Sequence, residues 1–543
     1  MSSFEVRKWE IWYTFSTYFE SRVDDLESVA RTLVELEISD CVVLSNGQTF
    51  CRVDEEVVSG ETILKISGDL KQASARFDTN SEFELTGYAR ETWLIGVQFL
   101  FAEARQISPG MELPTPHLRA FLKPIVLIKE EERISRVYPV IILYKSGILI
   151  IEFRLIGPNE PVPLDDFISE YVNIQQCDYD FAFVPPMLSA LASEAYYTFF
   201  FPPNNITGRL KFLRVKEKQK NALKELAQTT RIGGFDFDFV PLSKPDDKET
   251  VTSIALTLFS VFGLITQKPA SSIKFLIKGQ PSLPSIGNYW SGKPHIHLID
   301  YSDQQDSSSS NEEIHREAFG KMLARVSGTT GIFSEYVPLD ARKFEDYSAY
   351  ITSSATLWAW SKSGIDKQKQ WMDINNGHLI YEHQTQIELL EYGFMLHKAL
   401  VEKSGKLKDL SGILTTRRDL VELKSKMLET TPFGEVRDLL IKGWEKMNVE
   451  AMQSQILENL SILESEIKLI ESKKSDTFRV ALTLFGFILS ASFAKSVAAP
   501  LWKAFDWWLP QDSSYSELYL FGFSAFSVTA VVFLIRFIIY RRS

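Results

Sequence analysis

Two long apolar stretches close the chain. The first, residues 478–499, contains Arg479 and Lys495 as its only charged residues, and the second, residues 518–540, is uncharged until Arg536. An apolar run of this length suits a helix that crosses about 30 Å of hydrocarbon. The pattern therefore predicts two transmembrane helices, at about 478–499 and 518–540, within a C-terminal region 477–543.

Basic residues set the expected orientation of this hairpin. Lys473 and Lys474 precede the first stretch, and Arg541 and Arg542 follow the second. Basic residues concentrate on the cytosolic side of membrane proteins. We therefore expect a multi-pass protein of the cell membrane (inner or plasma membrane), with both termini in the cytosol, a short outside loop and membrane lipid as a partner.

Apolar residues also recur at helical spacing before the first stretch. Residues 435–476 contain no proline, and steps of four and three residues separate Ile456, Leu460, Leu463, Ile467 and Ile470. Such steps place one apolar stripe on a helix. A helix that continues into the first stretch would be roughly 90 Å long. With the helix formers of 381–403 and 408–430, region 371–476 is expected to hold folded-back helices and a long stalk helix.

Residues 1–370 mix strand and helix patterns. The clearest strand pattern lies within 137–155, where VYPVIILY and ILIIEFRL flank the turn candidate Lys145-Ser146-Gly147. Further strands are expected at 40–44, 92–101, 272–277 and 295–299, and helices at 24–37, 186–199, 210–228 and 312–326. The expected fold class is thus an α/β (or α+β) cytosolic region of one or two units, followed by the stalk and the hairpin.

Composition and charge narrow the partners. The formal net charge is −11, and no basic patch with interleaved aromatic residues stands out, so no direct nucleic-acid partner is expected. The chain has three cysteines, Cys41, Cys51 and Cys177, an odd number without metal-ligand spacing. This usage fits a reducing compartment.

Candidate chemistry is sparse. Gly287 to Lys293 has the spacing of a phosphate-binding loop, but Pro294 stands where a magnesium-binding hydroxyl belongs and a strand pattern follows. His295 and His297 would share one face of a strand and could bind a metal with Asp300 or His315, although satisfied histidines are the simpler interpretation. No catalytic motif is present, so an enzyme is not expected.

Small side chains line one face of the first apolar stretch. Thr483, Gly486, Ser490, Ala494 and Val497 follow one another at steps of three and four residues. In a membrane such a face allows close helix packing or lines a narrow water path. Both interpretations stay open on the residues alone.

The layout of residues 381–543 resembles the CorA family of divalent-cation channels. Local similarity lies in LLEYGFMLHKAL (389–400) and in the stretch from TTPFGEVRDLL to SEIKLI (430–470). The resemblance implies a homopentamer in which Thr483, Gly486, Ser490, Ala494 and Val497 line a pore, with a divalent cation such as magnesium as its ion.

The sequence departs from this family at the pore mouth. The family's Gly-Met-Asn is absent, and residues 495–500 read KSVAAP. A ring of Lys495 side chains would repel cations, which argues against selective magnesium uptake.

The expected function is therefore a homo-oligomeric CorA-like ion channel, gated through its cytosolic region and without the magnesium filter. CorA-like proteins without the tripeptide resemble effectors of prokaryotic antiviral systems, including type III CRISPR systems, in which a small nucleotide messenger opens the pore. Two further hypotheses are a membrane-tethered scaffold or binding protein and a membrane-anchored enzyme.

Overall fold

The computed structural model describes residues 4–19, 22–53, 55–66, 73–79, 84–106, 116–129, 133–157, 160–200, 202, 205–242, 248–267, 289–342, 345–371, 379–407, 410–430, 434–504, 522, 526 and 529–530. The chain divides into two compact units. The first consists of Met1–Lys403 with Arg418–Ile456, and the second of Ser404–Arg417 with Leu457–Ser543.

Strands dominate the first unit. They are β1 (Glu5–Tyr18), β2 (Ser39–Leu44), β3 (Gln48–Val53), β4 (Glu56–Ile66), β5 (Ala73–Asp78), β6 (His117–Leu122), β7 (Ile125–Lys129), β8 (Arg133–Tyr144), β9 (Ile148–Ile156), β10 (Val162–Pro163), β11 (Phe181–Val184), β12 (Gln228–Ile232), β13 (Phe235–Pro241), β14 (Trp290–Tyr301), β15 (Tyr347–Ile351) and β16 (Thr356–Trp360). They form one 16-stranded sheet whose main path runs β15-β16-β14-β1-β9-β8-β6-β2-β3-β4-β5. Along this path, β14 and β16 are parallel.

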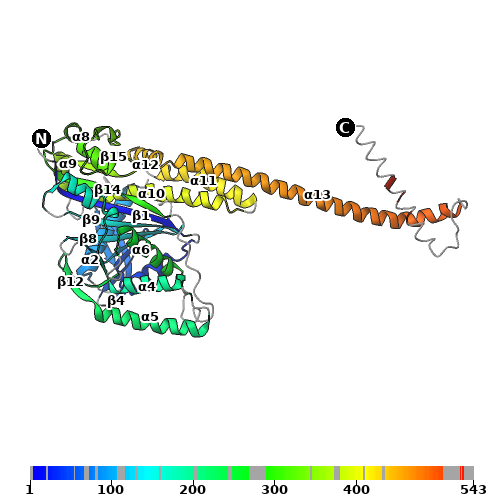
Figure 1. Ribbon diagram of the computed structural model, residues 1–543, viewed down its shortest axis with the longest axis horizontal. Helices are drawn as coiled ribbons and strands as arrows, with labels where there is room; N and C mark the ends of the chain where they lie inside the picture. Colours follow the sequence, from blue (N-terminus) through cyan, green and yellow to red (C-terminus); the bar gives the residue numbers. More distant parts are fainter. Residues whose placement is uncertain are drawn as a thin grey trace. The chain divides into compact units, whose positions relative to one another are not determined.

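Helices are interspersed with the strands along the chain, and five of the described helices come after β16 (Figure 1). They are α1 (Leu26–Glu35), α2 (Gly87–Gln106), α3 (Leu164–Asp166), α4 (Pro186–Phe200), α5 (Ile206–Leu226), α6 (Val251–Thr266), α8 (Ser308–Ala324), α9 (Lys362–Trp371), α10 (Leu379–Ser404), α11 (Leu410–Thr430), α12 (Gly434–Lys446) and α13 (Val449–Ala504). Short helical turns lie at η1 (Phe167–Val172), η2 (Ile174–Gln176) and η3 (Ser334–Tyr336).

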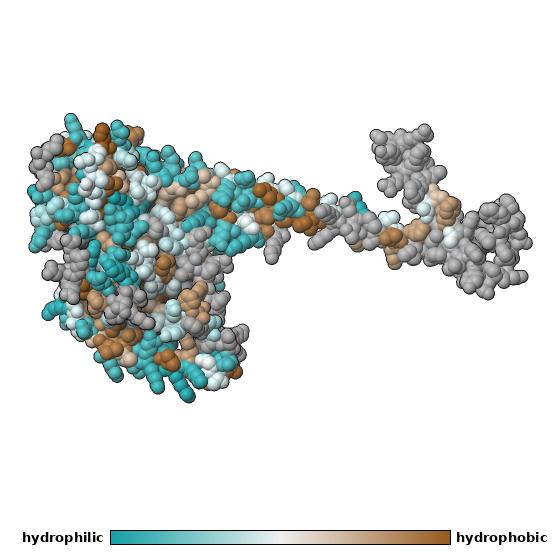
Figure 2. All heavy atoms as spheres, in the orientation of Figure 1, coloured by the Kyte–Doolittle hydropathy of each residue, from teal (hydrophilic) through white to brown (hydrophobic). Residues whose placement is uncertain are grey.

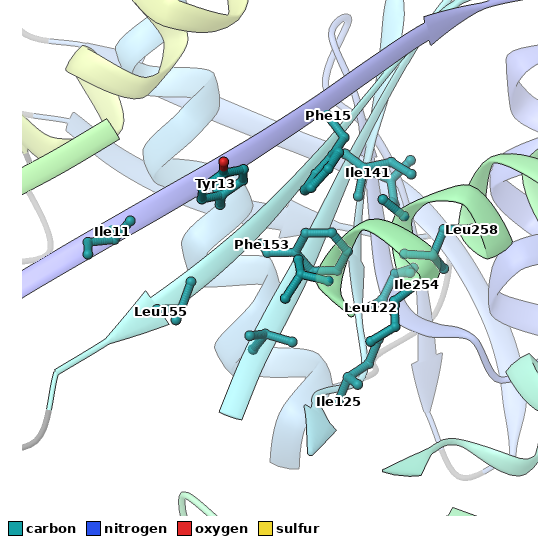
Figure 3. Packing of buried hydrophobic residues seen from close by; sticks show 14 of the residues in the cluster. Ile11, Tyr13, Phe15, Leu122, Ile125, Ile141, Phe153, Leu155, Ile254 and Leu258 are labelled. Carbon is teal, nitrogen blue, oxygen red and sulfur yellow. The ribbon is translucent and has the colours of Figure 1, made fainter. Parts of the chain in front are cut away.

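The sheet of the first unit is covered on both faces, because side chains alternate along each strand. On β1, the side chains of Ile11, Tyr13 and Phe15 pack with α1, α4, α6 and α8. Figure 3 shows these side chains along β1, with Phe15 near Phe153 of β9. Trp12 points to the opposite face, where it shares a core with α2, α10 and α12.

Several sequence predictions are confirmed. Strands β8 and β9 pair as the expected antiparallel hairpin, with Gly147 at a φ of 93° in the turn. The expected strands at 40–44 and 295–299 lie in β2 and β14, and the expected helices correspond to α1, α4, α5 and α8. Helices α10 and α11 match the expected segments 381–403 and 408–430 closely.

Other predictions are wrong or fall outside the described residues. Residues 92–101 belong to α2 rather than to a strand, because their apolar run fits both periods and only the longer helix places Val97, Leu100 and Phe101 in the core. Strand β1 was not predicted, although its alternation is visible in the sequence. The expected strand at 272–277 lies outside the described residues.

The expected continuous stalk is interrupted once. Helix α12 ends at Lys446, and α13 begins at Val449 after Asn448, which has a φ of 58°. Asparagine adopts this left-handed conformation more readily than most residues do, so it ends one helix and starts the next. Beyond this break α13 continues as one helix of 56 residues.

Within the second unit, polar contacts join the early part of α11 to α13. Arg417 and Glu464 form an ion pair at 2.9 Å. The Asn459 side-chain amide donates to the Ser404 hydroxyl at 3.1 Å. Ile413 and Leu460 are buried, so apolar packing accompanies these contacts.

The predicted transmembrane hairpin is contradicted within the part of the chain that the structure describes. A membrane-crossing helix needs about 20 mainly apolar residues, and no helix among the described residues is both long and apolar enough. Helix α13 passes through 478–499, but the side chains of 488–500 are outside the description. Apart from 522, 526, 529 and 530, the second predicted helix (518–540) also lies outside it. The membrane location and the channel description, which both rest on the hairpin, are corrected accordingly.

A β-bulge in β14 explains a glycine that had suggested phosphate binding. Tyr13 pairs with Pro294 and Phe15 with Ser291, so Gly292 and Lys293 together face Thr14 of β1. A Cβ atom on Gly292 would lie 1.7 Å from the Thr14 carbonyl oxygen. Gly292 is therefore needed for the close approach of two strands.

Replacing Gly292 with alanine should destabilise the first unit by about 2 kcal/mol or more, because the backbone of β1 cannot yield to the added methyl group. Chemical denaturation checks this. Gly434→Ala is the matched control, since a Cβ there meets nothing within 4 Å. Equal stability of the two variants would contradict the close approach.

Candidate functional site

Helix α10 meets the sheet through a polar stripe. Gln384, Glu388 and Glu391 follow one another at steps of four and three residues, which places them on one helix face. Their exposed fractions are 0%, 3% and 0%. Charged side chains are almost never buried to this degree unless they are paired, so their partners define the site.

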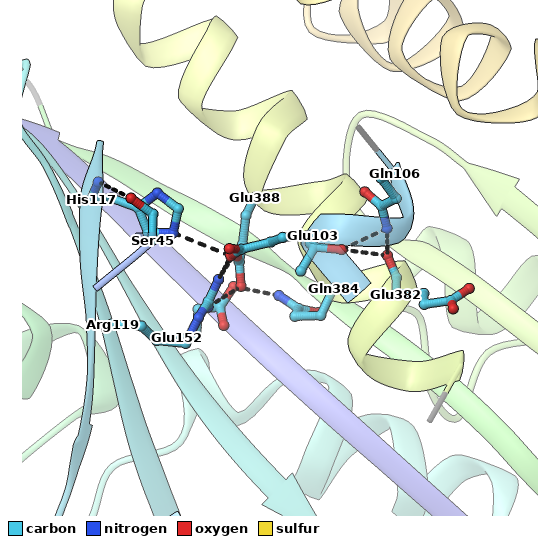
Figure 4. A network of polar contacts seen from close by, with 10 residues as sticks. Ser45, Glu103, Gln106, His117, Arg119, Glu152, Glu382, Gln384 and Glu388 are labelled. Carbon is cyan, nitrogen blue, oxygen red and sulfur yellow. Dashed lines mark hydrogen bonds and ion pairs between the residues drawn. The ribbon is translucent and has the colours of Figure 1, made fainter. Parts of the chain in front are cut away.

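Arg119 of β6 is the centre of the first cluster (Figure 4). Its two terminal nitrogens donate to the two carboxylate oxygens of Glu388 at 2.5 and 2.6 Å. One of them also donates to Glu103 of α2 at 2.8 Å. The His117 ring lies 3.2 Å from Glu103. Arg119 therefore ties α2 and α10 to one strand of the sheet.

Glu152 of β9 adds a further carboxyl group to this cluster. It accepts a hydrogen bond from the side-chain amide of Gln384, as Figure 4 shows. Its second oxygen, Oε2, has no hydrogen-bond partner among the described residues. The cluster thus holds three carboxyl groups around one guanidinium group.

Burial shifts the titration of these groups in different directions. It disfavours the charged form of Glu103, but His117 and Arg119 outweigh it and lower the pKa of Glu103 to about 2. Burial, reinforced by Glu388, raises the pKa of Glu152 well above its ordinary value. Burial also raises the pKa of Glu388, against the opposing effect of Arg119.

The two short Arg119–Glu388 bonds still require a charged Glu388 carboxylate, because protonation would remove one of its two acceptors. The raised pKa therefore makes Glu388 easier to protonate than an ordinary ion-paired carboxylate. Glu152, whose only described bond comes from an amide, has no described cation paired with it, and burial raises its pKa well above the ordinary value.

A second cluster lies one turn further along α10. The Thr14 hydroxyl of β1 donates to Glu391 Oε1 at 2.6 Å, and the His295 ring lies 3.2 Å from the same oxygen. His295 also contacts the Thr356 hydroxyl at 2.6 Å. Lys293 is 1% exposed and donates to the Thr352 carbonyl oxygen at 3.0 Å.

Glu391 and Lys293 have matched titration behaviour. Burial raises the pKa of Glu391 to about 8, although Thr14 and Lys293 oppose this shift. Burial lowers the pKa of Lys293 to about 8, although Glu391 opposes it. Burial and the charge of Lys293 lower the pKa of His295 well below its ordinary value, so this ring is neutral. Near neutral pH Glu391 is therefore a protonated, neutral acid, and Lys293 is a buried ammonium group.

The candidate metal ligands, for which satisfied histidines are the simpler interpretation, are brought together only in part. His295 and His297 share the α10 face of β14 and both are 0% exposed, but His297 stacks on Trp358 at 4.8 Å and on His383 at 5.7 Å. Asp300 pairs with Arg7, and His315 contacts the carbonyl oxygen of Asp303. Among the described residues, no three His, Cys, Asp or Glu side chains are placed to hold a metal.

The segment from Gly287 to Lys293, which has only the spacing of a phosphate-binding loop, does not have the structure of one. Gly287 and Asn288 lie outside the described residues, and Trp290 to Lys293 belong to strand β14 instead of opening a helix. The lysine that would contact phosphate is buried against Thr352. This strand and this buried lysine agree with the strand pattern that the sequence shows after the motif.

The residues predicted to line a pore all lie on α13. Thr483 is exposed, and its hydroxyl donates to the Arg479 carbonyl oxygen at 2.7 Å. A Cβ on Gly486 would meet nothing within 4 Å. The side chains of Ser490, Ala494, Lys495 and Val497 lie outside the described residues, so their predicted roles stay predictions.

Sequence reasoning missed the carboxyl groups that form the site. Two signals were present: Glu152 interrupts the apolar run ILIIEFRL, and Gln384, Glu388 and Glu391 have the spacing of one helix face. A charged residue within a buried strand needs a partner. The partner could not be named, because Arg119 and Glu388 are 269 residues apart.

Comparisons with known proteins add no family to this picture. No family model, no curated protein and no solved structure matches the chain. The CorA-like resemblance stays a prediction, and the functional argument rests on the site itself.

The raised pKa of Glu391 predicts how stability depends on pH. The unfolded chain loses the Glu391 proton near pH 4.5, whereas the folded chain keeps it until about pH 8. Stability from this group is present below pH 4.5 and falls as the pH rises to 8. Between pH 5 and 8, wild type should therefore lose at least about 1 kcal/mol more than Glu391→Gln, which keeps an oxygen acceptor for Thr14.

Urea denaturation at pH 5, 6, 7 and 8 measures this difference. The exposed Glu335→Gln variant is the control and should follow the wild-type curve. Lys293 acts above this window, because its lowered pKa adds stability as the pH rises beyond about 8. Parallel curves for wild type and Glu391→Gln would show that Glu391 is already ionised in the folded protein.

Proposed function

We propose that this protein is a conformational signalling protein, in which the first unit controls whether α10 is docked on the sheet. The polar interface beneath α10 carries the proposal. Undocking would change the helical segments that continue from α10 along the chain, so docking of α10 would be the output of the first unit. Binding of a signal, rather than catalysis, is the activity we assign to the first unit.

The burial of the site favours a switch over an enzyme. Glu152, His295 and Glu391 are each 0% exposed, so a substrate could reach them only after α10 had moved. Their displaced pKa values then have a conformational meaning, because undocking would return each group to water and to its ordinary titration. The protonation of these three side chains is thereby linked to the position of α10.

The charged groups between α10 and the sheet favour reversible docking of this helix. An apolar interface of similar size loses about 25 cal/mol for each Å² that is exposed to water. Charged groups regain their hydration when both partners are exposed together, which offsets much of the lost pairing energy. The α10 interface combines Ile387, Leu390 and Met395 with the polar stripe. The apolar residues stabilise the docked helix, and the polar stripe lowers the free energy that undocking costs.

The second unit supports a further element of this proposal, the self-association of the chain. Phe478, Leu482 and Phe485 follow one another at steps of four and three residues on α13, with exposed fractions of 67%, 54% and 62%. Exposed apolar stripes of this kind mark interaction sites. A homo-oligomer that buries the stripe would couple the docking state of several copies.

Hydrogen exchange tests the switch directly. Arg119→Met leaves Glu103 and Glu388 without their cation, at a cost of about 3–5 kcal/mol, and should raise amide exchange in α10 far more than in α1 on the opposite face. Thr14→Val, which removes one donor to Glu391, is the milder variant if Arg119→Met fails to fold. Arg76→Met is the control, since Arg76 is 80% exposed. If α10 and α1 open together in every variant, docking is not a separate transition and the proposal fails.

Light scattering tests the self-association. The chain has a mass of 62.0 kDa, and we expect a multiple of it. The double variant Phe478→Ser, Phe485→Ser should reduce the measured mass, whereas Ile134→Ser, at a residue 56% exposed on β8, should leave it unchanged. A wild-type mass of one chain would contradict the homo-oligomer while leaving the α10 switch to its own test.

A further inference from the structure

Four aromatic side chains are exposed together on α4. Tyr196, Tyr197, Phe199 and Phe200 have exposed fractions of 55%, 49%, 61% and 57%. Their rings contact one another, with centroid distances of 5.8 Å for Tyr196–Tyr197, 4.7 Å for Tyr196–Phe200 and 4.9 Å for Phe199–Phe200. Exposed aromatic clusters are typical of protein interfaces.

An apolar groove of about 320 Å³ adjoins this cluster, between α4 and α6. Small residues such as Ala192, Ala195 and Gly263 line it, and Phe199 and Phe259 contribute rings. The hydroxyls of the lining residues Thr257 and Ser260 donate to carbonyl oxygens of their own helix, at 2.9 and 3.0 Å. The groove therefore favours an apolar side chain over a polar one.

Helix α5 gives the same surface a positive charge. It carries seven basic residues, Arg209, Lys211, Arg214, Lys216, Lys218, Lys220 and Lys224, against the acidic Glu217 and Glu225. It packs beside α4, where Lys216 pairs with Glu194 at 2.6 Å. None of the residues of α5, all of which are described, is buried. Figure 2 shows hydrophilic side chains projecting along this helix, with hydrophobic atoms between them.

This helix opposes the charge of the molecule. The whole chain has a net charge of −11, so α5 is a local basic patch beside aromatic rings, which sequence analysis did not find. Such a patch attracts acidic partners and speeds their association.

We propose that the exposed surface of α4, α5 and the α4–α6 groove, which we call the α4–α5 surface, binds an acidic, amphipathic helical segment of a partner protein. An apolar side chain of the partner occupies the groove, and the aromatic cluster covers the neighbouring turn. The partner's carboxylates face the basic residues of α5. This combination is the helix-in-groove mode of recognition.

Nucleic acid fits the surface less well. Phosphates would satisfy α5, and bases could stack on Tyr196 or Phe200. The groove, however, offers apolar walls in which the described hydroxyl donors are already engaged, whereas a base edge carries donors and acceptors that would lose their hydration there. The groove therefore favours an apolar side chain over a nucleic-acid base.

The α4–α5 surface is independent of the α10 site. Buried residues of α4 and α6 pack with α1 on one face of the sheet, and α10 packs on the other. Failure of either proposal therefore leaves the other unaffected.

Fluorescence anisotropy with the full-length protein tests this surface. The probe is a labelled helical peptide of roughly 20 residues, with Leu and Phe at helical spacing and Glu elsewhere. A control peptide has Lys in place of every Glu. We expect binding of the acidic peptide only, and a weaker affinity at higher salt.

Two variants separate the apolar and the charged contributions. Phe199→Ser with Phe200→Ser should weaken binding at least about tenfold, because exposed aromatic residues act as interface anchors. Lys211→Glu with Lys218→Glu changes exposed residues of α5 and should weaken binding and remove its salt dependence. Tyr336→Ser, at a residue 60% exposed on η3, is the control and should bind like wild type.

Three outcomes would overturn the proposal. One is a dissociation constant weaker than about 0.1 mM for the acidic peptide. Another is equal binding of the acidic and basic peptides. The third is displacement of the acidic peptide by single-stranded oligouridine or by phosphatidylserine vesicles at lower concentration, which would assign the surface to nucleic acid or to an anionic lipid surface instead.

Discussion

The burial of Arg119 between Glu103 and Glu388 is the interaction on which the first unit depends. A buried guanidinium group is tolerated only when carboxylates satisfy it, and here these carboxylates come from α2 and α10. Neither helix can shift along the sheet without leaving a buried charge unpaired. Apolar packing holds the helices on the sheet, but the ion pairs determine where along it they sit.

The alternation of β1 explains why the two faces of the sheet differ. Ile11, Tyr13 and Phe15 give one face an apolar core, whereas Glu10 and Thr14 give the other face polar groups that need partners. Glu10 accepts hydrogen bonds from Arg154, and Thr14 donates to Glu391. β1 thus supplies only apolar side chains to the core on one side of the sheet, whereas on the other side it adds polar groups that need partners to an apolar core that includes Trp12.

Sequence patterns predicted what local periodicity determines, and missed what distant residues determine together. The β8–β9 hairpin and helix α10 were predictable, because each carries its own period of apolar residues. Helix α2 was mistaken for a strand, since its apolar run fits both periods. The site was out of reach for another reason: a stripe such as Glu388 and Glu391 looks like a solvated helix face until the sheet that covers it is known.

The ion pairs around Arg119 respond differently to the substitution of one partner and to the undocking of α10. Substituting Arg119 leaves two buried carboxylates without their cation. The folded state is therefore destabilised strongly, and the free energy of unfolding falls. Moving α10 away exposes both partners to water, and each regains hydration while Glu152 and Glu391 regain their ordinary acidity. Sensitivity to mutation and readiness to open therefore coexist in one interface. A purely apolar interface would not behave in these two ways, because apolar side chains gain no favourable hydration when they are exposed to water.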